Sequence, residues 1–173
     1  MSILETKIKS VDRFITKKAR VSIRNPQSAI GHPKTWLSID FDRIGYREAW
    51  ELQGHLVNAR KERRLQNDIV LFLEHPSVFT LGRRGGRECL LVSDEFLEKA
   101  DIQVIQVERG GNITFHGPGQ LVVYPIVDLQ AARIKVVDFV SGLEEVMLRT
   151  AKKWGIAAER NPANRGIWVG PHK

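Results

Sequence analysis

A single histidine lies within a glycine-rich segment, RGGNITFHGPGQ (residues 109–120), between two apolar runs. Glycine is needed where the backbone takes a positive φ or approaches a ligand closely, so the four glycines predict main chain wrapped around a ligand. Free N–H groups of such a loop can hold an anion or a developing oxyanion, and Arg109, His116 and Thr114 add polar groups. The alternative is a glycine-rich β-hairpin with a structural histidine. The segment matches neither a P-loop nor a dinucleotide-binding fingerprint.

Three further positions carry candidate chemistry. The run GRRGGR (residues 82–87) could contact phosphate or nucleic acid, although such loops are more often simply solvated. His75 precedes Pro76 at the end of an apolar run, where a histidine is usually structural and less often forms the wall of a site. Cys89 has only arginines nearby as possible cationic partners and is a poor candidate for a nucleophile.

Composition indicates one globular domain, since the chain has 173 residues of which 42% are hydrophobic. The longest apolar run, residues 121–127, is broken by Pro125 and is too short to span a membrane. No secretory signal is recognisable at the N-terminus. One cysteine allows no internal disulfide, which fits a reducing compartment, so we expect a cytoplasmic protein with no membrane association.

The net charge of +7 is concentrated at the N-terminus, because residues 1–34 contain eight Lys or Arg and two Asp or Glu. We therefore predict a basic extension, residues 1–35, followed by one catalytic domain, residues 36–173. An arm for nucleic acid or an acidic partner is one interpretation. However, the aromatic residues that stack on bases are nearly absent, which favours a solvated or partly helical tail. Residues 8–23 could form a basic amphipathic helix.

Hydrophobic periodicity predicts an α+β fold. A surface helix should start near residue 46, with Tyr46, Ala49, Trp50, Leu56 and Val57 on one face. Strands are predicted at residues 68–73, 77–81, 102–107 and 121–127, with a short helix capped by Ser93. A longer amphipathic helix should cover residues 140–154 and end at Gly155. A last strand begins at residue 167 without being completed. Because strands are adjacent in sequence as well as separated by helices, a mixed sheet is expected.

Four stretches carry a resemblance to a known family: LEHPSVFTLGRRG (73–85), LLVSDEF (90–96), VERGGNITFHGPGQLVVYPIVDL (107–129) and RGIWVGPHK (165–173). They resemble the octanoyltransferases of lipoate biosynthesis, and the resemblance covers about residues 36–173. It implies the mixed β-sheet with flanking helices of lipoate- and biotin-protein ligases. It also implies transfer of an octanoyl group from acyl carrier protein to a lysine of a lipoyl domain through a cysteine thioester. The expected acceptors are 2-oxoacid dehydrogenases and the glycine cleavage H protein.

The resemblance also implies roles for particular residues. Lys173 matches the lysine that lowers the pKa of the nucleophilic cysteine, and an adjacent ammonium does favour a thiolate. His75 matches a histidine of the family pattern and is a possible pocket wall. No metal and no cofactor are expected. The family's substrate-binding stretch matches eight positions: Arg109, Gly110, Gly111, Asn112, Ile113, Thr114, Phe115 and His116.

One departure from the family pattern affects activity. In the family, further substrate-binding segments and the nucleophilic cysteine follow the lysine, so we expect this chain to lack that cysteine and to have a fold that is incomplete at its C-terminus. Two functional hypotheses follow. The chain is an octanoyltransferase that acts as a monomer, or it is a non-catalytic binding module for acyl carrier protein or lipoyl domains. Binding of nucleic acid is not expected, because only unfocused charge supports it.

Overall fold

The computed structural model describes residues 19–24 and 36–173, which form two compact units. The first unit ends at Val127, and the second comprises Asp128–Lys173. Each unit is described by itself below. The predicted extension, residues 1–35, lies outside the described residues except for residues 19–24.

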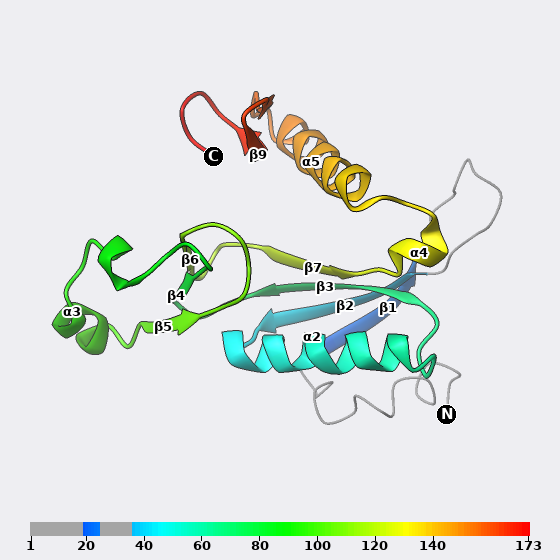
Figure 1. The fold of residues 1–173 in the computed structure, drawn as a ribbon, viewed down its shortest axis with the longest axis horizontal. Helices are drawn as coiled ribbons and strands as arrows, with labels where there is room; N and C mark the ends of the chain where they lie inside the picture. Colours follow the sequence, from blue (N-terminus) through cyan, green and yellow to red (C-terminus); the bar gives the residue numbers. More distant parts are fainter. Residues whose placement is uncertain (1–18, 25–35) are drawn as a thin grey trace. The chain divides into compact units, whose positions relative to one another are not determined.

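The first unit is built on a four-stranded mixed sheet in the order β1-β2-β3-β7 (Figure 1). The central strands β2 (Trp36–Arg43) and β3 (Asp68–Glu74) are parallel and are joined by helix α2 (Tyr46–Lys61). The outer strands β1 (Ala19–Arg24) and β7 (Val122–Ile126) are antiparallel to their neighbours. A parallel pair needs such a crossover connection, whereas the antiparallel neighbours do not.

Helix α2 covers one face of this sheet and forms the main core with it (Figure 1). The alternating residues Ile69, Leu71 and Leu73 of β3 are at most 1% exposed, as expected for a strand with one face against a helix. The prediction that Trp50 and Val57 lie on the buried face of α2 is wrong, since they are 43% and 37% exposed. The helix instead buries two small and two large residues at helical spacing: Ala49, Leu52, Leu56 and Ala59.

A second sheet of the first unit has the order β5-β4-β6. Strand β4 (Val78–Leu81) is parallel to β5 (Gln103–Gln106) and antiparallel to β6 (Ile113–His116). Between β4 and β5 lie the short helices η2 (Arg87–Cys89) and α3 (Asp94–Lys99). The predicted cap of α3 is confirmed, because the Phe96 N–H donates to Ser93 Oγ at 3.2 Å.

The second unit contains α4 (Leu129–Ala132), α5 (Val136–Lys153) and a hairpin of β8 (Glu159–Asn161) and β9 (Asn164–Trp168). The predicted long helix is confirmed, and Gly155 follows its end with φ +73°. The prediction of an incomplete strand from residue 167 is wrong. That strand begins at Asn164 and pairs with β8, a hairpin that the weakly apolar residues 159–164 did not indicate.

The predicted α+β class with a mixed sheet agrees with this architecture. The amphipathic helix predicted for residues 8–23 is wrong where it can be examined, since residues 19–24 form β1 against β2. Ala19 and Val21, two residues apart on β1, both pack on the main core, as expected for a strand with one buried face. Among the described residues, no helix is long and apolar enough to cross a membrane.

Candidate functional site

The glycine-rich segment and the arginine-rich turn that follows β4 are joined through their backbones. Three consecutive N–H groups, of Gly82, Arg83 and Arg84, donate to the carbonyls of Asn112, Arg109 and Gly111 at 2.6, 3.0 and 3.2 Å. The segment from residue 109 to 112 is thus held by accepting hydrogen bonds from its neighbour. The run of residues 82–87 was expected to be a simply solvated loop more often than a binding loop. Its backbone instead holds the predicted substrate-binding stretch in place.

Two glycines of the turn are required for this close approach. A Cβ at Gly82 would lie 2.5 Å from the Gly111 carbonyl oxygen, and one at Gly85 would lie 2.6 Å from backbone atoms of Asn112. Both contacts are with backbone, which cannot rotate away as a flexible side chain can. Gly111 itself has φ +87°, a conformation that favours glycine.

The side chain of Arg109 turns towards β4. Its guanidinium donates to the Thr80 carbonyl at 2.7 Å, to Thr80 Oγ1 at 3.0 and 3.3 Å, and to the Gly110 carbonyl at 2.9 Å. Thr80 is fully buried, so these bonds fix the arginine to the strand. All its acceptors are neutral oxygens, which leaves its positive charge uncompensated.

A cluster of rings links the two sheets of the first unit, with His75 at its centre. His75 has no exposed surface. Its Nδ1 lies 2.8 Å from the Ile44 carbonyl oxygen and its Nε2 lies 2.9 Å from Tyr124 Oη. A carbonyl can only accept, so we assign the proton to Nδ1, and Nε2 then accepts from the Tyr124 hydroxyl. Tyr46 and His116 complete the cluster, with ring centroids 5.1 and 5.7 Å from that of His75.

The cluster favours uncharged side chains. Burial lowers the pKa of His75, and the nearby His116 acts in the same direction, while the hydrogen bond to the Ile44 carbonyl opposes both. Burial also raises the pKa of Tyr124. For Tyr46, burial raises the pKa and the positive charge of Arg109 partly offsets that effect. His75 is therefore neutral at pH 7, and both tyrosines retain their protons.

The eight residues of the predicted stretch do not present their side chains to one side. On β6, His116 pairs with buried Val78, and its ring stacks with Tyr46 at a centroid distance of 6.0 Å. Phe115 points to the opposite face, where its ring lies 5.0 Å from that of Phe79. Because strand side chains alternate, Thr114 shares the His116 face and Ile113 shares the Phe115 face.

A carboxylate from β3 holds the second glycine turn. The N–H of Gly119, which has φ +86°, donates to Glu74 Oε2 at 2.9 Å. His116 is oriented by the same turn, because its Nδ1 lies 2.6 Å from Gln120 Oε1. The glycine-proline-glycine sequence thus positions the imidazole.

Lys173 belongs to the second unit, where its side chain lies against Gly166 of β9. Its aliphatic chain crosses Gly166, where a Cβ would lie 2.6 Å from Lys173 Cε. The Gly166 N–H donates to Glu144 Oε1 at 2.9 Å, and Arg160 and Arg165 each lie 3.6 Å from Glu144 Oε2. The predicted catalytic role of Lys173 stays a prediction.

Sequence reasoning did not single out Thr80, Tyr124 or Glu74 as parts of this site. Tyr46 was assigned only to a helix face. Each lies at a strand or helix position with ordinary composition, and only their pairing in space with Arg109, His75 or Gly119 distinguishes them. A polar Thr80 within the apolar run VFTL was the one usable signal.

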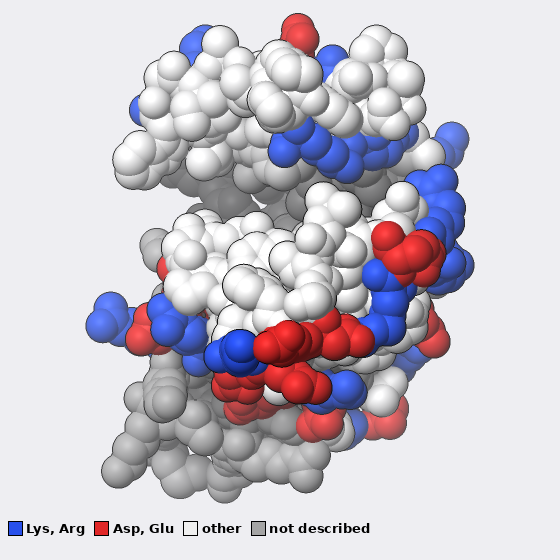
Figure 2. All heavy atoms as spheres, turned by 90° about the vertical axis from the view of Figure 1, so that its left-hand side faces the viewer, with Lys and Arg blue, Asp and Glu red and all other residues white. Residues whose placement is uncertain are grey.

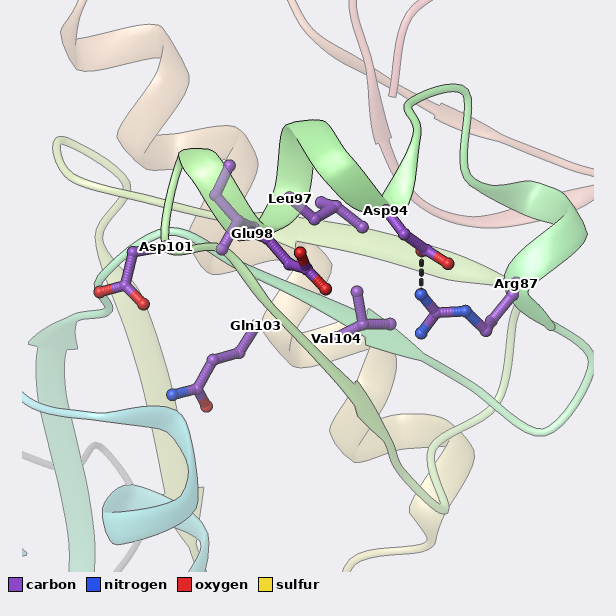
Figure 3. A pocket seen from close by; sticks show the side chains of 8 residues that line it. Arg87, Asp94, Leu97, Glu98, Asp101, Gln103 and Val104 are labelled. Atoms are coloured by element: carbon purple, nitrogen blue, oxygen red, sulfur yellow. Dashed lines mark hydrogen bonds and ion pairs between the residues drawn. The ribbon is translucent and has the colours of Figure 1, made fainter.

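A cavity of about 360 Å³ lies on α3 and β5 (Figure 3). Arg87 and Asp94 point towards each other across its rim and form an ion pair, and Glu98 and Asp101 are also at its edge. This largely polar lining does not suit a fatty acyl chain. In residues 19–24 and 36–173, no group of three His, Cys, Asp or Glu side chains could hold a metal ion.

Residues 45–173 match the family described as the lipoyl protein ligase A/B catalytic domain. The chain belongs to this family. The predicted family membership is therefore confirmed, and the fold agrees with it. A structure of LipL1 from P. falciparum in complex with lipoate superposes with a TM-score of 0.50 at 10% identity, covering 76% of this chain and 41% of that chain.

Two curated relatives in this family are named octanoyltransferase. The protein from Syntrophobacter fumaroxidans is 45% identical over 135 residues, covering 78% of this chain and 59% of the relative. The protein from Caldicellulosiruptor bescii is 46% identical over 132 residues, covering 75% of this chain and 58% of the relative. The chain thus spans less than two thirds of the length of these relatives.

We predict that Gly82→Ala lowers the free energy of unfolding by about 1–3 kcal/mol, because its methyl group would overlap the Gly111 carbonyl. Gly54→Ala, within α2 and with no atom close to the added methyl, is the control and should raise stability by up to about 1 kcal/mol. Urea denaturation followed by tryptophan fluorescence measures both. Equal effects of the two substitutions would contradict the close approach.

We predict that acidification below pH 6.5 destabilises the protein through His75. Its pKa in the folded chain is below the usual 6.5, so the unfolded chain binds the proton first and unfolding is favoured as pH falls. The stabilisation is complete above pH 6.5 and is lost below it, with a slope of at most about 1.4 kcal/mol per pH unit.

The measurement is the free energy of unfolding between pH 5 and 8 for wild type and His75→Asn. The variant should be less stable at pH 7, since it disturbs the Ile44 and Tyr124 partners, and should show a shallower pH dependence. Exposed His172→Asn is the control. A slope that His75→Asn leaves unchanged would refute the assignment of a neutral buried imidazole.

Proposed function

We propose that residues 36–173 form the acyl-binding part of an octanoyltransferase. The enzyme would move an octanoyl group from acyl carrier protein to a lysine amine of a lipoyl domain, such as those of 2-oxoacid dehydrogenases and the glycine cleavage H protein. Membership of the lipoyl protein ligase A/B family, together with relatives named octanoyltransferase, supports this proposal. The single observation on which it depends most is the glycine-rich stretch fixed beside the ring cluster.

In the proposed reaction a cysteine thiolate attacks the carbonyl carbon of the octanoyl thioester, and the carrier leaves as a thiolate, which takes up the proton that the lysine amine loses in the second step. The lysine amine of the lipoyl domain then attacks the enzyme thioester, an amide forms, and the cysteine thiolate is released. The proposed role of Lys173 is to lower the pKa of that cysteine. The proposed reaction uses no metal and no nucleotide.

The proposed nucleophile is not Cys89, the one cysteine in this sequence. Cys89 ends the short helix η2 between β4 and α3. The stretch that is proposed to hold the acyl group follows it in sequence, and among the described residues no hydrogen bond or ion pair involves its thiol. The thioester-forming cysteine is therefore proposed to lie outside residues 1–173.

The side of β6 that carries Thr114 and His116 is the proposed acyl-binding side. Partly exposed, neutral rings of Tyr46 and Tyr124, which pack on buried His75, provide apolar surface there, and the hydroxyl groups and His116 provide hydrogen bonds for a carbonyl. A site of this kind, apolar with a few placed polar groups, is typical for small ligands.

The chain, mixed with octanoyl-acyl carrier protein and a lipoyl domain, tests the function by calorimetry and by intact-protein mass spectrometry. We expect binding of the octanoyl carrier, no covalent octanoyl adduct, and identical behaviour of wild type and Cys89→Ser. An adduct that Cys89→Ser abolishes would refute the assignment of the nucleophile. Failure to bind either protein would refute the function, whereas binding without transfer is also what the binding-module alternative predicts.

We predict that His116→Ala weakens binding of octanoyl-pantetheine by about 5- to 30-fold, corresponding to a loss of about 1–2 kcal/mol of contact and hydrogen bonding. The matched control is Phe115→Ala, one residue away on the opposite face of β6, which should change the affinity by less than about twofold. Fluorescence titration measures both. A larger effect of Phe115→Ala would place the acyl group on the other face.

A further inference from the structure

The turn after β4 presents two arginines on a rigid backbone. Arg83 and Arg84 are exposed, yet their main-chain N–H groups are held by the carbonyls of Arg109 and Gly111. The turn is closed by a further bond from Gly85 N–H to the Gly82 carbonyl at 2.9 Å. Anchoring of the backbone means that little further ordering of main chain is needed when a ligand binds to the side chains.

The two guanidinium groups have no anionic partner within the described residues. Two neighbouring cations are neutralised, because Arg87 pairs with Asp94 and Lys99 pairs with Glu95. Figure 2 views the end of the first unit that carries α3, where side chains of both charges, Lys and Arg as well as Asp and Glu, border an uncharged area. Arg83 and Arg84 are therefore available cations directly attached to the predicted substrate-binding stretch.

We propose that Arg83 and Arg84 bind the phosphate group of the phosphopantetheine arm that carries the acyl group, an inference that rests on the proposed function. Guanidinium groups bind phosphate oxygens through paired, charge-assisted hydrogen bonds. The acyl group enters the site on that arm, and the arm carries a phosphate some distance from the thioester. An anchor beside residues 109–112 would hold the arm while the acyl group occupies the site.

The charges favour the donor over the acceptor. The lysine that receives the octanoyl group approaches as an ammonium, which two uncompensated guanidinium groups repel. The lipoyl domain also carries no phosphate on its lysine. The arginines thus discriminate between the two substrates by the sign of the charge that each brings to this turn.

A second pair of adjacent arginines provides a matched control. Arg63 and Arg64 lie beyond the C-terminal end of α2, at the opposite end of the first unit from the 82–87 turn (Figure 1). Both are exposed, and Arg64 pairs with Glu62 at 2.5 Å. Replacing both residues by Gln changes the net charge as much as the same change at Arg83 and Arg84.

The test compares binding of octanoyl-4′-phosphopantetheine with that of octanoyl-pantetheine by calorimetry. Wild type and Arg63→Gln/Arg64→Gln should both prefer the phosphorylated compound by about tenfold or more at low salt. Arg83→Gln/Arg84→Gln should bind the two compounds within about twofold of each other and should bind octanoyl-pantetheine as wild type does. The preference of wild type should decrease as salt increases.

Three outcomes would overturn the inference. If wild type binds both compounds equally, it does not bind the phosphate group. If Arg83→Gln/Arg84→Gln keeps the preference for the phosphorylated compound, other residues bind the phosphate group. If Arg63→Gln/Arg64→Gln lost the preference for the phosphorylated compound equally, the preference would depend only on the net charge of the protein. In these cases the proposed function stands, because octanoyl-pantetheine still binds. If neither compound binds wild type, the proposed function fails, and this inference fails with it.

Discussion

A buried imidazole with a hydrogen bond at each ring nitrogen is the centre of the ring cluster on which the proposed site depends. His75 joins the Ile44 carbonyl, between β2 and α2, to the Tyr124 hydroxyl of β7. Burial favours the neutral ring by lowering the pKa of His75, and in the neutral ring both bonds are made by the tautomer with its proton on Nδ1. A charged side chain at this fully buried position would lose its hydration, which costs free energy. The ring cluster therefore depends on the absence of charge at its centre.

The candidate substrate-binding stretch divides its work between main chain and side chains. Residues 109–112 contribute backbone, since three of their carbonyls accept bonds from the turn that follows β4. From Ile113 onwards the stretch is a strand, so only alternate side chains, Thr114 and His116, face the cluster. Eight consecutive residues can therefore belong to one site without eight side chains contacting one ligand. The glycines allow the close backbone approach of residues 109–112. In residues 113–116, strand alternation determines which side chains face the ring cluster.

Much of the fold follows from local sequence signals. Short apolar runs located β3 and β7, and the Ser93 cap located α3, because these signals depend on near neighbours in the chain. The buried face of α2 was predicted in part: Ala49 and Leu56 were included correctly, whereas exposed Trp50 and Val57 were included and buried Leu52 and Ala59 were not. Small residues allow a helix to pack closely on a sheet. Which face of the helix packs there is determined by the sheet, so the sequence of the helix alone does not show it.

The site was less predictable than the fold for a similar reason. Composition marked Arg109 and the glycines, but their partners lie elsewhere in sequence: Thr80 is 29 residues away from Arg109. The basic N-terminal region is an instructive case, because its charges suggested a tail although Ala19 and Val21 pack on the main core. Charge is visible in composition, whereas strand pairing between Ala19–Arg24 and β2 depends on a distant neighbour.

Arg109 keeps its positive charge because the oxygens that surround it are neutral. Its acceptors are the hydroxyl and carbonyl of Thr80 and the carbonyls of Gly110 and Asn112. These dipoles orient the guanidinium. Unlike a carboxylate, they do not cancel its positive charge. The same charge reaches Tyr46, whose pKa it lowers against the effect of burial. A neutral ring cluster beside a retained positive charge would suit the proposed ligand, which has an uncharged acyl end and an anionic group further along. The division of the 82–87 turn, with backbone directed inward and guanidinium groups outward, extends that positive region to the surface.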